Sequence, residues 1–142
     1  MERRLLQIVV AVAGLVPIAG GFAGVIWGAG GLGELAGGDL DSHYRYLSGL
    51  LAAIGVAYWS AIPEIEREGR KIGLLTLIVV AGGFARALGM LITGPPSLLM
   101  SAALIMELVV APAIYFWQSR LARRGATPRP EPAPIDAAGS QG

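Results

Sequence analysis

Two charged side chains lie inside apolar stretches, and they are the residues best placed to do chemistry. They are Arg86 and Glu107. A charged residue at the centre of a membrane helix costs about 2.5–3.5 kcal/mol on insertion scales, so such residues face the protein interior and find partners. Arg86 is eight residues before Gly94, and Glu107 is ten residues after Ser97. A short turn between antiparallel helices would place both side chains at similar depths, which predicts an Arg86–Glu107 ion pair.

The pair has a structural and a functional interpretation. A buried ion pair can fix the register of two helices without adding stability. An ionisable residue inside a membrane span is equally a candidate for handling a ligand or an ion. Glu107 could act as a general acid or base only if Arg86 left a position beside it free.

A second polar cluster comprises Asp41, Ser42, His43 and Arg45. Asp41 or Ser42 would cap a helix, and Asp41 and Arg45 form an i,i+4 pair. If the helix face that carries Arg45 points inward, Arg45 lies about one to two turns above Arg86. Arg45, Arg86 and Glu107 would then line an outward-opening site for an anion. His43, at its mouth, could respond to pH near 6–7.

Several kinds of site lack their usual residues. The chain has no cysteine, and its one histidine, His43, cannot form a multi-histidine metal site. Residues 28–33 match G-x-G-x-x-G, but they follow an apolar helical stretch instead of a strand, so we interpret them as a pliable loop. No basic stripe with interleaved aromatic residues suggests nucleic acid. We therefore predict no catalytic residue, metal or cofactor, and no nucleic-acid partner.

The elements that position these residues are predicted to be membrane helices. The chain of 142 residues is 54% hydrophobic and 15% charged, with a mean hydropathy of +0.62. A membrane span needs about 20 mostly apolar residues. Four stretches qualify, at about 5–27, 44–62, 72–93 and 97–117. We expect an all-α, integral membrane four-helix bundle over residues 1–120.

Small residues indicate where these helices pack, because they let two backbones approach closely. One helix face is predicted in each of the first three spans. These faces comprise Gly20, Gly24 and Gly28; Ser48, Ala52 and Gly55; and Gly82, Gly83 and Gly89. They suit a tight intramolecular bundle, and a dimerisation face is the alternative.

Lysine and arginine placement predicts the orientation, because these residues favour the cytoplasmic side. One side of the bundle would carry nine of them, and the other only Arg45. The nine are Arg3, Arg4, Arg67, Arg70, Lys71, Arg120, Arg123, Arg124 and Arg129. Both termini are therefore expected in the cytoplasm, in a bacterial inner (plasma) membrane. The proline-rich residues 121–142 are expected to form a disordered cytoplasmic tail.

Five sequence segments resemble those of one protein family. They are Ser42–Gly49, Ile62–Glu66, Gly82–Arg86, Gly94-Pro95-Pro96 and Glu107-Leu108, in this order. Together they resemble the bacterial domain-of-unknown-function 4345 family of small four-span membrane proteins. The resemblance covers about residues 1–120 and brings no established activity with it.

Two functions remain open. The first is a non-catalytic accessory or assembly partner of other membrane proteins in the lipid bilayer, with a homo-oligomer as a further possibility. The alternative is a small carrier or binder for an anionic amphiphile, such as a lipid headgroup, or for a small organic acid. The alternative requires a polar cavity that reaches Arg86 from outside. The accessory function requires an exposed small-residue or aromatic face.

Overall fold

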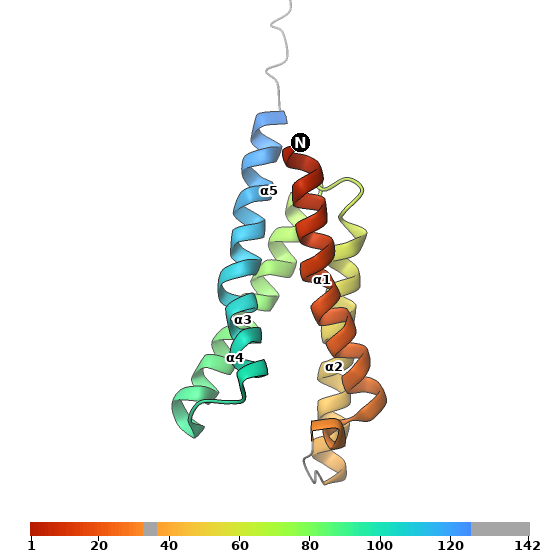
Figure 1. The fold of residues 1–142 in the computed structure, drawn as a ribbon, viewed down its shortest axis with the longest axis vertical. Coiled ribbons are helices and arrows are strands. Elements are labelled where there is room, and N and C mark those ends of the chain that lie inside the picture. The colour runs from red at the N-terminus through yellow and green to blue at the C-terminus, as the bar shows by residue number, and fades with distance from the viewer. Residues whose placement is uncertain (33–36, 126–142) are drawn as a thin grey trace, which may run out of the picture.

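The computed structural model describes residues 1–32 and 37–125, in which every regular element is a helix (Figure 1). The long helices are α1 (Glu2–Trp27), α2 (Gly38–Ser60) and α3 (Gly69–Thr93). The fourth is continuous over α4 (Leu98–Ile105), the π-helix η2 (Met106–Val110) and α5 (Ala111–Gly125). A short 3-10 helix, η1 (Ala29–Leu32), follows α1. The all-α prediction is confirmed.

The helices form two antiparallel hairpins, α1 with α2 and α3 with α4–α5 (Figure 1). The end of the bundle that holds residue 1, the 61–68 connection and Gly125 is called the terminal end below. The opposite end, which holds Gly28, η1 and the 94–97 connection, is called the distal end. The hairpins converge at the terminal end and diverge towards the distal end.

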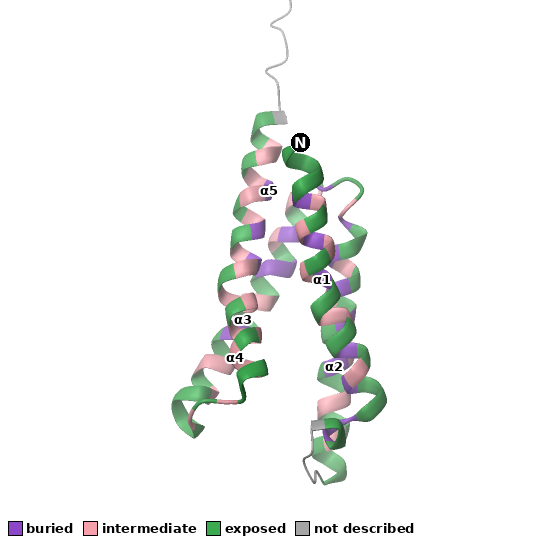
Figure 2. Ribbon diagram, viewed as in Figure 1, coloured by how far each residue is buried: buried purple, intermediate pink, exposed green. Residues whose placement is uncertain are grey.

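The buried core lies where the hairpins converge. It comprises Leu6, Val10, Tyr58, Ala61, Ile65, Ile72, Leu75 and Ile114. A hydrogen bond of 2.9 Å between the hydroxyls of Tyr58 and Thr76 also joins α2 to α3. By contrast, α4 and the part of α3 after Gly83 contain exposed and half-buried residues, which Figure 2 shows in green and pink. Packing between the hairpins is therefore concentrated at the terminal end.

Three polar side chains hold the 61–68 connection against the bundle. Arg3 donates to the Pro63 carbonyl at 2.9 Å, and Gln7 donates to that of Ile62 at 2.8 Å. Gln118 is buried and donates to the Ile65 carbonyl at 2.9 Å. These donors satisfy carbonyls that no helix pairs. They also hold the fully buried Ile65 side chain in the core.

Glycines allow the close approach of α1 to α2, but not all of the glycines predicted to lie at this contact are found there. A Cβ at Gly14, Gly21 or Gly24 would collide with α2, whose Ser48, Ala52 and Gly55 are buried against α1. Gly20 faces open space, and Gly28 ends the helix. The prediction is correct for Gly24 and for the α2 face, and wrong for Gly20. Gly28 lies just past the end of α1, where a Cβ would collide with Asp41 and Arg45 of α2.

On α3, the predicted face of Gly82, Gly83 and Gly89 is only partly correct. A Cβ at Gly83 would collide with Leu108, whereas a Cβ at Gly82 or Gly89 would meet nothing within 4 Å. Gly83 is therefore the close-contact residue between α3 and η2, and its two companions are not.

Among the described residues, three helices are long and apolar enough to cross a membrane: α1, α3 and the continuous helix Leu98–Arg124. They match the predicted spans 5–27, 72–93 and 97–117. The predicted span at 44–62 corresponds to α2, which is less apolar and does not meet the same criteria; Asp39, Asp41 and Arg45 lie in its first two turns. Helix α5 continues to Gly125, five residues into the predicted tail at 121–142, and the remaining residues 126–142 lie outside the described chain.

Candidate functional site

The predicted Arg86–Glu107 ion pair is present and joins α3 to η2. The Arg86 Nε donates to Glu107 Oε2 and its Nη2 donates to Oε1, both at 3.0 Å. This two-point geometry is the strongest arrangement for a guanidinium and a carboxylate. The pair is partly shielded, with 32% of the Arg86 side chain and 17% of the Glu107 side chain exposed. The two opposite charges therefore neutralise each other between the helices.

Gly83 makes room for this pair. A Cβ on Gly83 would lie 3.0 Å from the Cβ of Glu107 and 2.7 Å from Leu108 Cδ2. Gly83 lies one helical turn before Arg86, so η2 approaches α3 directly beside the ion pair. The close approach brings the Glu107 carboxylate within reach of the guanidinium.

Glu107 lies in a π-turn, which sequence reasoning did not anticipate. The amide of Ala111 donates to the Met106 carbonyl, five residues earlier, as a π-helix requires. Pro112 follows directly, has no amide hydrogen, and its ring would crowd the Leu108 carbonyl in a regular helix. Pro112 is thus the sequence signal that could have revealed the π-turn. Such turns often occur at functional sites.

The third contact of Arg86 is a weak one. Its Nη1 donates to the thioether sulfur of Met100 at 3.0 Å. A guanidinium has five N–H donors, and a thioether is a poor acceptor. Within residues 1–32 and 37–125, Glu107 and Met100 account for three of the five.

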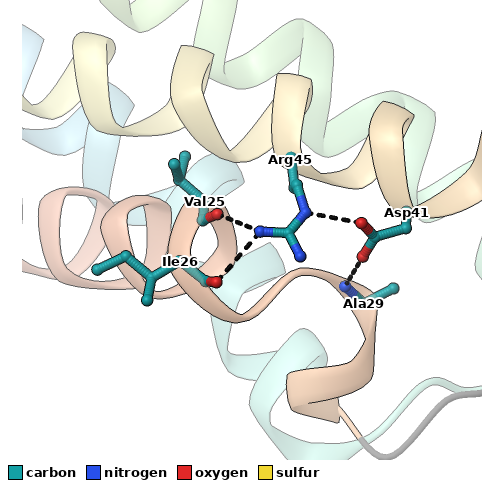
Figure 3. A network of polar contacts seen from close by, with 5 residues as sticks. All are labelled: Val25, Ile26, Ala29, Asp41 and Arg45. Carbon is teal, nitrogen blue, oxygen red and sulfur yellow. Dashed lines mark hydrogen bonds and ion pairs between the residues drawn. The ribbon is translucent and has the colours of Figure 1, made fainter.

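Arg45 does not extend the Arg86 site; it holds the end of α1 instead (Figure 3). Its Nη1 donates to the carbonyls of Val25 at 2.6 Å and Ile26 at 3.1 Å, and its Nε donates to Asp41 at 2.7 Å. Unpaired carbonyls and the negative end of the helix dipole favour a cation at a helix C-terminus. Arg45 therefore caps α1.

Asp41 completes this cap from the other side. Its Oδ1 accepts a hydrogen bond from the Ala29 amide at 2.9 Å. The hydrogen bond from Arg45, and then the one from Ala29, hold the pKa of the Asp41 carboxyl below its usual range. Gly28, with φ of 64°, turns the chain between these groups, and a side chain there would collide with Asp41 and Arg45.

The family model described as Domain of unknown function (DUF4345) matches residues 5–118. The chain is a DUF4345 protein. The match confirms the resemblance inferred from the sequence segments. No curated protein and no solved structure matches this chain.

In the DUF4345 chain, the four predicted site residues do not form one cluster. Arg86 and Glu107 pair on the α3–α5 hairpin, whereas Arg45 belongs to the cap on the α1–α2 hairpin. His43 is exposed near the start of α2, with its ring centroid 6.4 Å from that of Tyr46. Arg45 and Arg86 therefore bind different partners on different hairpins.

Metal-ligating side chains do not gather in the described part of the DUF4345 chain: no group of three His, Cys, Asp or Glu residues there could hold a metal ion. The candidate site therefore comprises the ion pair between α3 and η2, the π-turn that carries Glu107, and the edge of the guanidinium that faces Met100.

Proposed function

We propose that this DUF4345 protein is a non-catalytic accessory or assembly partner of other membrane proteins. In this proposal it crosses a bacterial plasma membrane four times, with both termini in the cytoplasm. Helix α2 supports four crossings because it packs along α1 from Gly14 near Trp59 to Gly24 near Ser48. The basic residues of the terminal end support the orientation.

The observation that carries the proposal is an apolar groove between α1 and α2. Its volume is about 460 Å³. It is lined by Phe22, Val25, Gly49, Ala52, Ala53, Val56, Ala57 and Ser60. Phe22, Val25 and Val56 are exposed. Small residues between larger apolar ones let the backbone of another helix approach closely within a membrane. The occupant we propose is a transmembrane helix of another protein.

The charged side chains within the helices favour this function over catalysis. Glu107 is neutralised by Arg86, so it is not poised to act as a general base. Arg45 is occupied by Asp41 and the α1 carbonyls. These residues hold helices together, as a scaffold requires.

Site-specific photocrosslinking in native membranes tests the groove. A photoreactive residue at Ala53, in the groove, should give one discrete adduct with another membrane protein. The matched control is Ala81, an exposed alanine on α3 outside the groove, which should give lipid adducts only. The substitution Ala57→Leu, which fills the groove, should abolish the adduct formed from Ala53.

Two outcomes would contradict the accessory function. An adduct between two copies of this chain would assign the groove to self-assembly. Equal lipid labelling from Ala53 and Ala81 would show that only lipid occupies the groove.

The contact between Arg86 and Met100 favours a second candidate, the binding of an anionic amphiphile. A carboxylate or phosphate oxygen is a much better acceptor than a thioether, so it could replace Met100 at Nη1 while Glu107 keeps its two bonds. The partial exposure of Arg86 would let such a group approach. Glu107 would then orient the guanidinium.

Native mass spectrometry in mild detergent tests this candidate. The wild-type protein should retain a small anionic molecule that the double variant Arg86→Ala/Glu107→Ala lacks. The double variant is preferable to Arg86→Ala because it leaves no unpaired Glu107 charge. If both proteins carry the same molecules, Arg86 does not bind an anionic amphiphile.

A further inference from the structure

The terminal end of the bundle carries more basic charge than its ion pairs use. Eight basic and four acidic side chains lie there within the described residues. Arg67 pairs with Glu64, Lys71 with Glu68 and Arg124 with Glu2. Arg3 donates to the Pro63 carbonyl. In the described chain, the remaining four, Arg4, Arg70, Arg120 and Arg123, are exposed and form no ion pair.

These four arginines come from three helices that meet at this end. The ion pair between Arg124 and Glu2, at 3.1 Å, joins the end of α5 to the start of α1. Gly69, at the start of α3, lies against the side chain of Gln118 in α5. Arg4, Arg70, Arg120 and Arg123 therefore belong to one end of a fixed assembly, not to independent loops.

Their depth matches that of lipid headgroups. Arg120 follows the aromatic pair Phe116 and Trp117 by about one helical turn. Tryptophan prefers the boundary between acyl chains and headgroups. With Trp117 at that boundary, the exposed Phe116 and the apolar part of α5 would lie on the acyl-chain side, and Arg120 and Arg123 on the headgroup side.

We propose that the terminal end of the bundle binds anionic phospholipid headgroups through Arg4, Arg70, Arg120 and Arg123. The charges are complementary, and an arginine matches a phosphate with two parallel hydrogen bonds. Each basic residue near a membrane surface strengthens the binding of anionic lipid about fivefold. The proposal relies on the membrane crossing proposed above, but not on an accessory function.

Fluorescence quenching in vesicles tests this proposal with the full chain. The chain has three tryptophans. With Trp27→Phe and Trp59→Phe, the remaining Trp117 reports on lipids at the terminal end. The vesicles contain phosphatidylcholine and phosphatidylglycerol, one of which is brominated near its headgroup. Quenching at Trp117 gives the relative binding of the two lipids.

The wild-type arginines should give a preference for phosphatidylglycerol that weakens at high salt, because salt screens surface charges. Arg120→Gln/Arg123→Gln should reduce that preference by up to about 25-fold, at about fivefold for each residue. The matched control is Arg67→Gln/Lys71→Gln, which removes the same amount of charge from residues already paired with glutamates. The control should retain most of the preference.

Two results would overturn the proposal. One is equal quenching by the two lipids in the presence of all four arginines at low salt. The other is an equal loss of preference in the control and in Arg120→Gln/Arg123→Gln, which would show a general charge effect without a site. Neither result bears on the groove between α1 and α2, so the two proposals can fail separately.

Discussion

Replacing Arg86 by alanine should be costly, because it leaves the Glu107 carboxylate charged and unpaired beside α3. Breaking a buried ion pair from one side costs about 3–5 kcal/mol, and the partial exposure of this pair favours the lower end of that range. We expect Arg86→Ala to lower the free energy of unfolding by about 3 kcal/mol. Unfolding in mixed detergent micelles, followed by tryptophan fluorescence, measures this change.

The charge-exchange variant Arg86→Glu/Glu107→Arg tests whether the ion pair alone accounts for this loss of stability. If pairing is the whole contribution of these residues, the exchange should recover most of the lost stability, because the two charges again neutralise each other. If the exchange variant is expressed as poorly and unfolds as easily as Arg86→Ala, pairing is not the whole contribution. The specific orientation around the π-turn and Met100 would then be required.

At the scale of single residues, the sequence predicted the ion pair because a three-residue turn at 94–96 sets the register of the two helices. It could not predict the direction of the Arg45 side chain. That direction depends on where α1 ends, and α1 ends at Gly28 with a positive φ that exposes the Val25 and Ile26 carbonyls. Spacing identified Asp41 as the i,i+4 partner of Arg45, but it did not identify the carbonyls of Val25 and Ile26.

At the scale of helices, adjacent glycines in α1 should respond in opposite ways to substitution. A Cβ at Gly21 would lie 2.5 Å from the Ala52 amide nitrogen and 2.6 Å from the Ser48 carbonyl oxygen, which are backbone atoms. Overpacking of this kind costs about 1–3 kcal/mol. A Cβ at Gly20 meets nothing within 4 Å, so alanine there should gain about 0.5–1 kcal/mol from its better helix propensity.

Unfolding of Gly21→Ala and Gly20→Ala under the same conditions checks this prediction. Gly21→Ala should be the less stable of the two, and Gly20→Ala should equal or exceed wild type. Equal stability of the two variants would mean that α1 and α2 do not pack through Gly21 in the membrane.

The same helices show why some packing faces could be predicted and others could not. The α1 residues that contact α2 are Gly14, Gly21 and Gly24, spaced seven and three residues apart. At 3.6 residues per turn, the predicted set of Gly20, Gly24 and Gly28 and the observed set each cover about 80° of the helix circumference. Spacing alone therefore did not distinguish the two sets. Which glycines pack was therefore determined by the α1–α2 crossing and not by the abundance of glycine in the sequence.

At the scale of the whole molecule, the positions of the four helices were predictable, while the packing between hairpins was not. Long apolar stretches located all four helices, although α2 begins six residues before its predicted span and the fourth helix ends eight residues after its own. The core depends on Ile65 in the 61–68 connection, which Arg3, Gln7 and Gln118 hold in place. The sequence predicted only a charged connection there, on the same side as the other basic residues. Its long-range contacts with α1 and α5 leave no periodic signal.

The number of membrane crossings decides the side on which each end of the molecule lies. Helix α2 has 23 residues, about 35 Å, which is long enough to span, and its charged residues occupy only the first two turns. With four crossings, residues 68 and 125 lie on the same side of the membrane as residue 1. If only the three most apolar helices cross, both lie on the opposite side.

Reporter fusions after residues 68, 96 and 125 separate these topologies. Green fluorescent protein folds to its fluorescent form in the cytoplasm, and alkaline phosphatase is active only outside it. We expect fluorescence after 68 and 125 and phosphatase activity after 96, because the close packing of α2 along α1 carries it across with its partner. Phosphatase activity after 68 would instead place α2 at the membrane surface, and its Ser48, Ala52 and Gly55 face could not then pack on α1 within the bilayer.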